Sequence, residues 1–96
     1  MIDDFPPYEW HGAGACAKWF SDFQTMSRSE GITAAAIAFG KPSHMDVSAG
    51  VAYVVVPTIL TFQRKGKPVQ DNGILTVTLR SDASGWRITG WVWSDQ

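Results

Sequence analysis

Three long runs of strand-forming residues, joined by short turns, constrain the fold of this chain most strongly. Residues 51–64, 69–80 and 86–93 are rich in Val, Ile, Thr and aromatic residues, which favour strands. The segments 65–67 and 81–85 join them, and connections this short cannot make a parallel crossover. The three runs are therefore predicted to be antiparallel neighbours in one sheet.

Two shorter strands and one helix are predicted ahead of these runs. Residues 32–39 and 44–47 are further candidate strands, each followed by a segment containing Gly. Residues 13–29 place apolar side chains at three- and four-residue spacing, which predicts an amphipathic helix.

The long strands also contain residues that would bend them. Pro57 requires an edge position or a bulge, and Gly73 and Gly90 are plausible bend points. Long strands twist and coil strongly. We therefore predict an α+β fold in which a strongly curved antiparallel sheet packs against one helix and encloses a cone-shaped cavity.

Length and composition restrict the classes of function. A chain of 96 residues is predicted to be one domain, 1–96, and burial is incomplete at this size, so a second subunit would help. The net charge of -1 gives no electrostatic signature for nucleic acid or an anionic membrane. Cys16 is the single cysteine, which excludes an intrachain disulfide and fits a cytoplasmic location. With only His11 and His44 as histidines, a metal site has little support, and no cofactor is predicted.

The first twelve residues carry the side chains best suited to site chemistry. Asp3, Asp4, Tyr8 and His11 are the candidate catalytic residues, in a segment that Pro6-Pro7 makes stiff and non-helical. A buried aspartate could act as a base, and strand alternation allows only one of the adjacent pair to face inward. The alternatives are a solvated strand end for the aspartates and a helix-capping or packing role for His11.

Aromatic residues are the candidates for binding a ligand. Trp91 and Trp93 share one face of the last strand, with Trp86 and Ile88 on the other unless Gly90 shifts the register. An aromatic-lined pocket would bind flat apolar molecules, although core or interface packing is the competing interpretation. The full set of candidate ligand-binding residues is Phe5, Trp10, Phe20, Thr76, Trp91 and Trp93.

Two stretches carry a family resemblance. They are Ile2-Asp3-Asp4-Phe5-Pro6-Pro7 with His11-Gly12, and Leu75-Thr76-Val77-Thr78-Leu79-Arg80 continuing through Gly85-Trp86-Arg87-Ile88 to Trp91-Val92-Trp93-Ser94. In this order, around a helix, they resemble the nuclear transport factor 2-like (NTF2-like) superfamily, whose cone is also called cystatin-like. The bacterial SnoaL-like and ketosteroid isomerase-like branch is the most similar one.

The resemblance implies a proton-transfer site with several departures from the family pattern. It places Asp3 or Asp4 at the position of the general base and Thr76 at that of a second acid. The family's tyrosine comes from a first helix for which this chain has no sequence, and Tyr8 could replace it only if the Pro-rich turn folds inward. An uncovered sheet would favour a homodimer formed through the sheet face.

Three functions are therefore expected, in this order. The first is an NTF2-like domain with an apolar cone-shaped pocket that binds a small hydrophobic molecule and dimerises. The second is an enzyme of isomerase, cyclase or dehydratase type with Asp3 or Asp4 as base and Tyr8, His11 or Thr76 polarising a carbonyl. The third is an association domain without a pocket.

Overall fold

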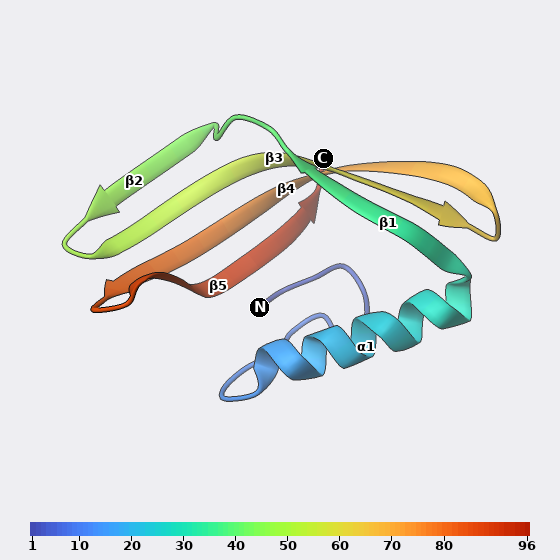
Figure 1. Cartoon of the computed structure of the whole chain (residues 1–96), viewed down its shortest axis with the longest axis horizontal. Coiled ribbons are helices and arrows are strands. Elements are labelled where there is room, and N and C mark those ends of the chain that lie inside the picture. Colours follow the sequence, from blue (N-terminus) through green and yellow to red (C-terminus); the bar gives the residue numbers. More distant parts are fainter.

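The computed structural model describes residues 1–96 and contains one helix and one antiparallel sheet (Figure 1). The sheet order is β1-β3-β4-β5, and β2 pairs with the other end of the same edge of β3. This confirms the predicted α+β class and antiparallel pairing. The elements are α1 (Ala15–Glu30), β1 (Ile32–Phe39), β2 (His44–Ser48), β3 (Val51–Arg64), β4 (Lys67–Asp82) and β5 (Gly85–Asp95).

The helix begins two residues later than predicted, for a backbone reason. Gly14 lies in the left-handed region (φ 81°), so it ends the preceding turn and cannot belong to the helix. At the other end Gly31 is also left-handed, and its N–H donates to the Arg28 carbonyl. Gly31 therefore closes the helix as predicted.

Pro57 occupies the kind of edge position that the sequence predicts. It pairs with Ile74 of β4 on one side. On the other side of β3, the last residue of β1 pairs with Thr58 and the first residue of β2 pairs with Val55, so neither strand pairs with Pro57. The N–H that proline lacks therefore leaves no ladder hydrogen bond unmade.

A bulge in β5 changes which side chains share a face. Thr78 pairs with Gly90, but the next residue of β4, Leu79, pairs with Ile88, so Thr89 is the extra residue. The bulge rotates Ile88 onto the face that carries Trp91 and Trp93. The sequence predicts Ile88 on the opposite face from these tryptophans unless Gly90 shifts the register, and the structure contains that shift.

The N-terminal residues form a small hairpin that is tied to the sheet. Ile2 bridges Glu9 in antiparallel fashion and Val92 of β5 in parallel fashion. Its N–H donates to the Trp91 carbonyl, and its carbonyl accepts from the Trp93 N–H, both at 3.0 Å. These bonds hold Asp3 and Asp4 beside the strand that carries the tryptophans.

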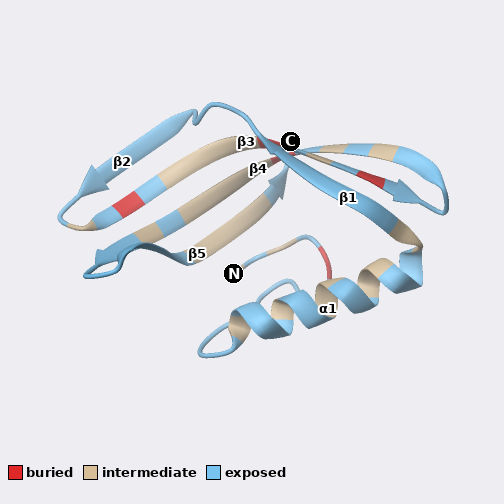
Figure 2. Cartoon of the chain, viewed as in Figure 1, coloured by how far each residue is buried: buried red, intermediate tan, exposed pale blue.

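The molecule is an open shell with few buried residues (Figure 2). Phe5, Trp10, Ala52 and Phe62 are its buried hydrophobic residues. The accessible surface is 6572 Å², against about 5,400 Å² for a compact monomer of this mass. The radius of gyration, 14.7 Å, likewise exceeds the value of about 12.5 Å for a compact domain. No helix has the length and apolar character needed to cross a membrane.

Candidate functional site

A cavity of about 610 Å³ lies between α1, the N-terminal hairpin and one face of the sheet. The residues facing it alternate along β3 and β4, as expected for one face of a pleated sheet, and in β5 they alternate except across the bulge at Thr89. Its walls are mainly apolar. The aromatic side chains in these walls are Phe5, Trp19, Phe23, Phe62, Trp91 and Trp93.

Aromatic contacts connect the helix to both the hairpin and the sheet. Trp19 of α1 meets Trp91 edge to face with ring centres 5.0 Å apart, and it stacks on Phe23 at 5.4 Å. Phe23 in turn contacts Phe5, which packs against Trp10. This chain of rings fixes α1 over the cavity, because each ring pair adds directional packing to the area it buries.

Trp93 lies across the backbone of β4 at Gly73. A Cβ atom at Gly73 would come within 2.2 Å of Trp93 Cζ2, so only glycine leaves room for the ring. Gly73 is itself buried. Because Gly73 has no side chain, the indole of Trp93 can lie over it and form part of the floor of the cavity.

The two adjacent aspartates have different surroundings. Asp3 Oδ2 accepts a hydrogen bond from Trp19 Nε1 at 2.9 Å, and Asp3 Oδ1 accepts one from the Asp4 N–H at 2.8 Å. The carboxyl group of Asp4 has no hydrogen-bond donor and no cationic partner. Asp3 thus holds the helix to the hairpin, whereas the Asp4 carboxyl group has no such structural contact.

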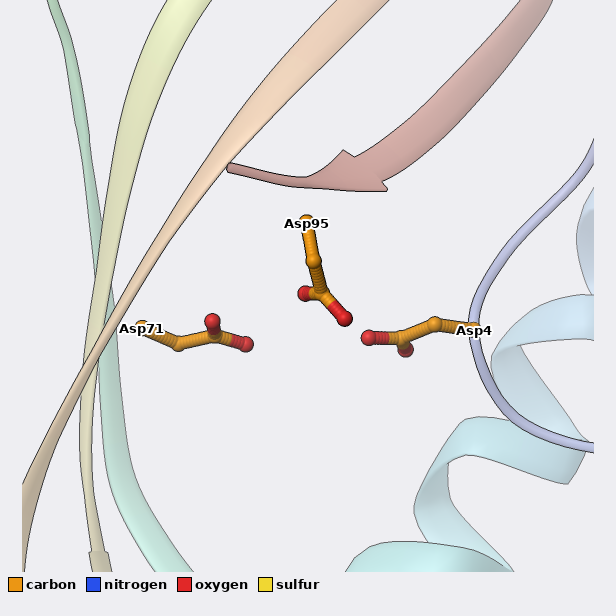
Figure 3. A group of neighbouring side chains, drawn as sticks. All are labelled: Asp4, Asp71 and Asp95. Carbon is orange, nitrogen blue, oxygen red and sulfur yellow. The ribbon is translucent and has the colours of Figure 1, made fainter.

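Asp4 meets two further carboxylates that come from distant parts of the chain. Asp71 of β4 and Asp95 of β5 each place a carboxylate oxygen within 4.8 Å of the other two groups (Figure 3). No lysine, arginine or histidine pairs with any of the three. Glu30 and Arg64 also line the cavity, and they form an ion pair at 3.2 Å in which the two charges neutralise each other. We refer to Asp4, Asp71 and Asp95 as the carboxylate cluster.

Burial and nearby negative charge make Asp4 and Asp71 weaker acids. Desolvation is the main cause that raises the pKa of Asp4 to about 6, followed by the charge of Asp3, a side-chain hydrogen bond with Asp3, and the charges of Asp95 and Asp71. Asp4 is an exposed residue overall, but its carboxyl group points toward the other two (Figure 3). The pKa of Asp71 is also raised, first by burial and then by the charge of Asp95. Both shifts favour the protonated form of these two carboxyl groups relative to a free aspartate.

The cluster has the hard oxygen atoms that calcium or magnesium takes as ligands. Three carboxylates supply only part of the six to eight oxygens of a calcium site, however, and magnesium requires near-ideal octahedral geometry. We therefore assign no metal to these residues.

Two of the predicted catalytic residues lie outside the cavity. Tyr8 is exposed in the hairpin turn at φ 71°, and its backbone N–H donates to the Phe5 carbonyl. His11 is exposed and its Nε2 pairs with Glu9 Oε2 at 3.0 Å. Neither residue is among those that line the cavity, so the structure does not bring Tyr8 or His11 together with Asp4 there.

Three of the predicted ligand-binding residues also lie elsewhere. Trp10 is buried beneath the hairpin, where its Nε1 donates to Asp22 Oδ2 at 2.9 Å, so its role is structural. Phe20 is exposed on α1, and although its ring lies 6.4 Å from that of Trp19, it is not among the residues that line the cavity. Thr76 alternates with Leu75 and Val77 and consequently faces the opposite side of the sheet. Phe5, Trp91 and Trp93, by contrast, do line the cavity, as do Asp3 and Asp4.

The prediction from sequence overlooked Asp71 and Asp95 as possible site residues. The signal was present in the two-residue period of the strands. Asp71 lies in step with Leu75 and Val77, and Asp95 lies in step with Trp91 and Trp93.

Comparisons with models of protein families, with curated proteins and with solved structures found no match. The functional argument therefore depends on the site itself.

Proposed function

We propose that this protein binds a small hydrophobic molecule in the cavity beneath the sheet. The observation that carries the proposal is the cavity itself, whose volume of about 610 Å³ is lined by indole and phenyl rings. Small-molecule sites occupy roughly 300–1,000 Å³ and combine apolar walls with a few polar groups. Here Asp4 and Asp71 supply the polar groups at one end.

The family that best accounts for this arrangement is the NTF2-like superfamily, in its SnoaL-like and ketosteroid isomerase-like branch. The aspartate-bearing hairpin, the single helix and the curved sheet, in that order, support this assignment. We further propose that the protein is cytoplasmic, requires no cofactor and forms a homodimer through its sheet. The large accessible surface for the mass of the chain supports the dimer.

A thermal-shift screen with neutral polycyclic compounds of steroid-like and polyketide-like shape tests the binding function. A compound that binds the native state raises the melting temperature in proportion to its occupancy of that state. We expect the larger shifts from flat, uncharged ring systems that match the aromatic walls. If the whole series leaves the melting temperature unchanged, an association domain without a ligand replaces this proposal.

A second candidate function is proton transfer, with Asp4 as the base. Its specific support is that Asp4 is unpaired at the cavity, has a pKa raised to about 6, and stands beside a second acid whose pKa is raised, Asp71. A general base is most effective when its pKa lies near the working pH. The Asp4 carboxylate would accept a proton from a carbon next to a carbonyl group. Asp71, whose pKa burial raises, would in its protonated form hydrogen-bond the enolate oxygen, and Asp4 would return the proton to another carbon.

Exchange of the α-protons of a cyclic ketone in heavy water, followed by NMR, tests this second function. We expect Asp4→Asn to abolish protein-dependent exchange, because the amide cannot accept the proton. Asp82→Asn is the control, since Asp82 lies in β4 at the far end of the sheet and pairs with Arg87. Equal exchange by wild type and Asp4→Asn, or none by wild type, would eliminate Asp4 as a base for such ketones.

A further inference from the structure

A groove of about 370 Å³ lies next to the cavity, between α1 and the start of β1. Phe20, Phe23 and Ile32 contribute its apolar walls, and Phe20 is 54% exposed. Ser27 and Arg28 contribute polar walls, and the Ser27 hydroxyl is buried without a hydrogen-bond partner. Buried polar groups are nearly always paired, so the single chain leaves this wall of the groove unsatisfied.

The groove adjoins a free edge of the sheet. β1 is the outermost strand, and its residues take part in none of the backbone hydrogen bonds outside the helix and the sheet. It has no charged residue and no proline, which commonly protect an exposed edge from pairing with another chain. A bulge at Ala34 and Ala35 interrupts its pairing with β3 beside the groove, so residues 36–39 form its regular part. In Figure 1, β1 begins near the C-terminal end of α1 and then diverges from the helix, which leaves this part open to a further strand.

Two residues of β1 direct their backbone groups away from the sheet. The Gly40 N–H donates to the Pro57 carbonyl at 2.8 Å, so the backbone groups of Gly40 face β3. Along an antiparallel strand, backbone groups face the partner strand at every second residue. Ala38 therefore also faces β3, whereas the N–H and C=O groups of Ile37 and Phe39 face the open side. These unpaired groups match the ladder of one added strand.

Positive charge gathers at the end of the edge where the groove lies. Arg64 pairs with the first residue of β1 on one side and with Lys67 on the other. The Lys65 N–H donates to the carbonyl of the residue that closes α1, which holds this basic turn against the helix end. Glu30 neutralises Arg64, but Arg28, Lys65 and Lys67 have no acidic partner. This surplus of positive charge is complementary to a partner that brings a carboxylate to this end.

We propose that the groove and the edge of β1 together bind an extended protein segment that ends in an acidic group. The segment adds to β1 as an antiparallel strand, through the backbone groups of Ile37 and Phe39. Because it runs antiparallel, its C-terminal end lies at the start of β1, where its carboxylate meets Arg28. An apolar side chain near that end occupies the groove beside Phe20. This interaction is separate from the binding of a small molecule in the cavity and does not depend on it.

An NMR titration of the full chain with a synthetic peptide tests the proposal. The probe is acetyl-Thr-Val-Thr-Val-Leu-Asp with a free C-terminal carboxylate. We expect it to slow the solvent exchange of the Ile37 and Phe39 amides, because they gain acceptors. The exchange of the Ala38 amide should change far less, because that N–H already faces β3.

Two N-methylated forms of the peptide serve as a matched pair. One carries methyl groups on the backbone nitrogens of its second and fourth residues, the other on those of its third and fifth. In an added strand only one of these two sets of N–H groups faces β1. One methylated peptide should therefore lose binding, and the other should keep it.

Two arginine substitutions test the role of charge. Arg28→Glu places a negative charge beside the peptide carboxylate and should raise the dissociation constant about fivefold. Arg80→Glu is the control, because Arg80 is also exposed and unpaired but lies opposite Val51, at the far end of β3 from β1. It should leave the dissociation constant unchanged. A peptide with Asn in place of Asp and a C-terminal amide should bind wild type and Arg28→Glu alike.

The NMR spectrum of each variant shows whether it is folded, and the methylated peptides require no variant. Absence of binding to the wild type, or equal binding of the two methylated peptides, would overturn the strand addition. An Arg28→Glu variant that binds the acidic peptide as tightly as the wild type would overturn the role of the acidic end. Slow exchange of the Ile37 and Phe39 amides in the free protein, increasing with protein concentration, would overturn the proposal and assign the edge to a second copy.

Discussion

The two ends of one sheet face have the same kind of sequence but different surroundings. Both ends alternate large apolar residues with polar ones. At the end covered by α1 and the N-terminal hairpin, Trp91 and Trp93 meet aromatic rings and a group of carboxylates. At the other end the side chains of Trp86 and Ile88 are largely exposed in the single chain. The difference shows that elements outside the strands decide which part of a sheet becomes a pocket and which part stays exposed.

Gly73→Ala should have the largest effect, because it acts on the tightest contact of the covered end. The new Cβ atom would clash with Trp93, and the ring must move or the strand must bend. We expect a loss of about 1–3 kcal/mol in the free energy of unfolding, measured by urea denaturation. Adding Trp93→Leu should recover part of this loss, since the two sites share one contact. If Gly73→Ala unfolds at the wild-type urea concentration, the covered end is not tightly packed at this point.

Asp3→Ala should have the next largest effect. It leaves Trp19 Nε1–H without its acceptor and releases the hydrogen bond between the helix and the hairpin. The expected cost is about 1–2 kcal/mol of unfolding free energy. Asp3→Asn is the matched control because it keeps an acceptor oxygen, so it should cost less. Equal costs for the two substitutions would mean that the hydrogen bond does not hold the cover in place.

Asp4→Asn should have a smaller effect of the opposite sign. Because the folded-state pKa of Asp4 is raised from 3.8 to about 6, its contribution to stability is complete below pH 4 and is lost as the pH rises through 6. At pH 7 we expect Asp4→Asn to stabilise the protein by about 1 kcal/mol, a value reduced for solvent screening. Urea denaturation from pH 4 to pH 7 measures this.

Part of the pH dependence should remain in Asp4→Asn. The pKa of Asp71 is also raised, so its contribution falls with rising pH in the same direction. The pKa values of Asp22 and Asp82 are lowered, so their contributions are lost only as the pH falls into the acid range. The difference between wild type and Asp4→Asn isolates Asp4. A difference that does not change with pH would show that Asp4 titrates normally.

Local pattern was sufficient to predict the fold class and half of the site. The strand runs, the helix and the edge position of Pro57 follow from propensity, periodicity and the geometry of proline. The placement of Asp3, Asp4, Phe5, Trp91 and Trp93 at one cavity follows from the extended N-terminal segment and from alternation.

The remaining site residues depend on register and on turn geometry. Asp95 meets Asp4 and Asp71 because β5 ends with Asp95 paired to Gly73 of β4, a register that no local pattern specifies. The bulge at Thr89 determines the face of Ile88. Tyr8 lies exposed in a turn with a left-handed backbone, His11 pairs with Glu9, and Thr76 is excluded by the alternation that places Leu75 and Val77 inside.

The central claim is that the covered end of the sheet holds a ligand cavity, and filling that cavity tests it most directly. Ala35 lines the cavity, whereas its neighbour Ala36 pairs with Thr61 on the opposite face. Titration with N-phenyl-1-naphthylamine, whose fluorescence rises in an apolar site, should give saturable binding to wild type and Ala36→Phe. Ala35→Phe should bind the dye at least tenfold more weakly while keeping the wild-type circular dichroism spectrum. Undiminished binding to Ala35→Phe, or no binding to the wild type, would contradict the claim.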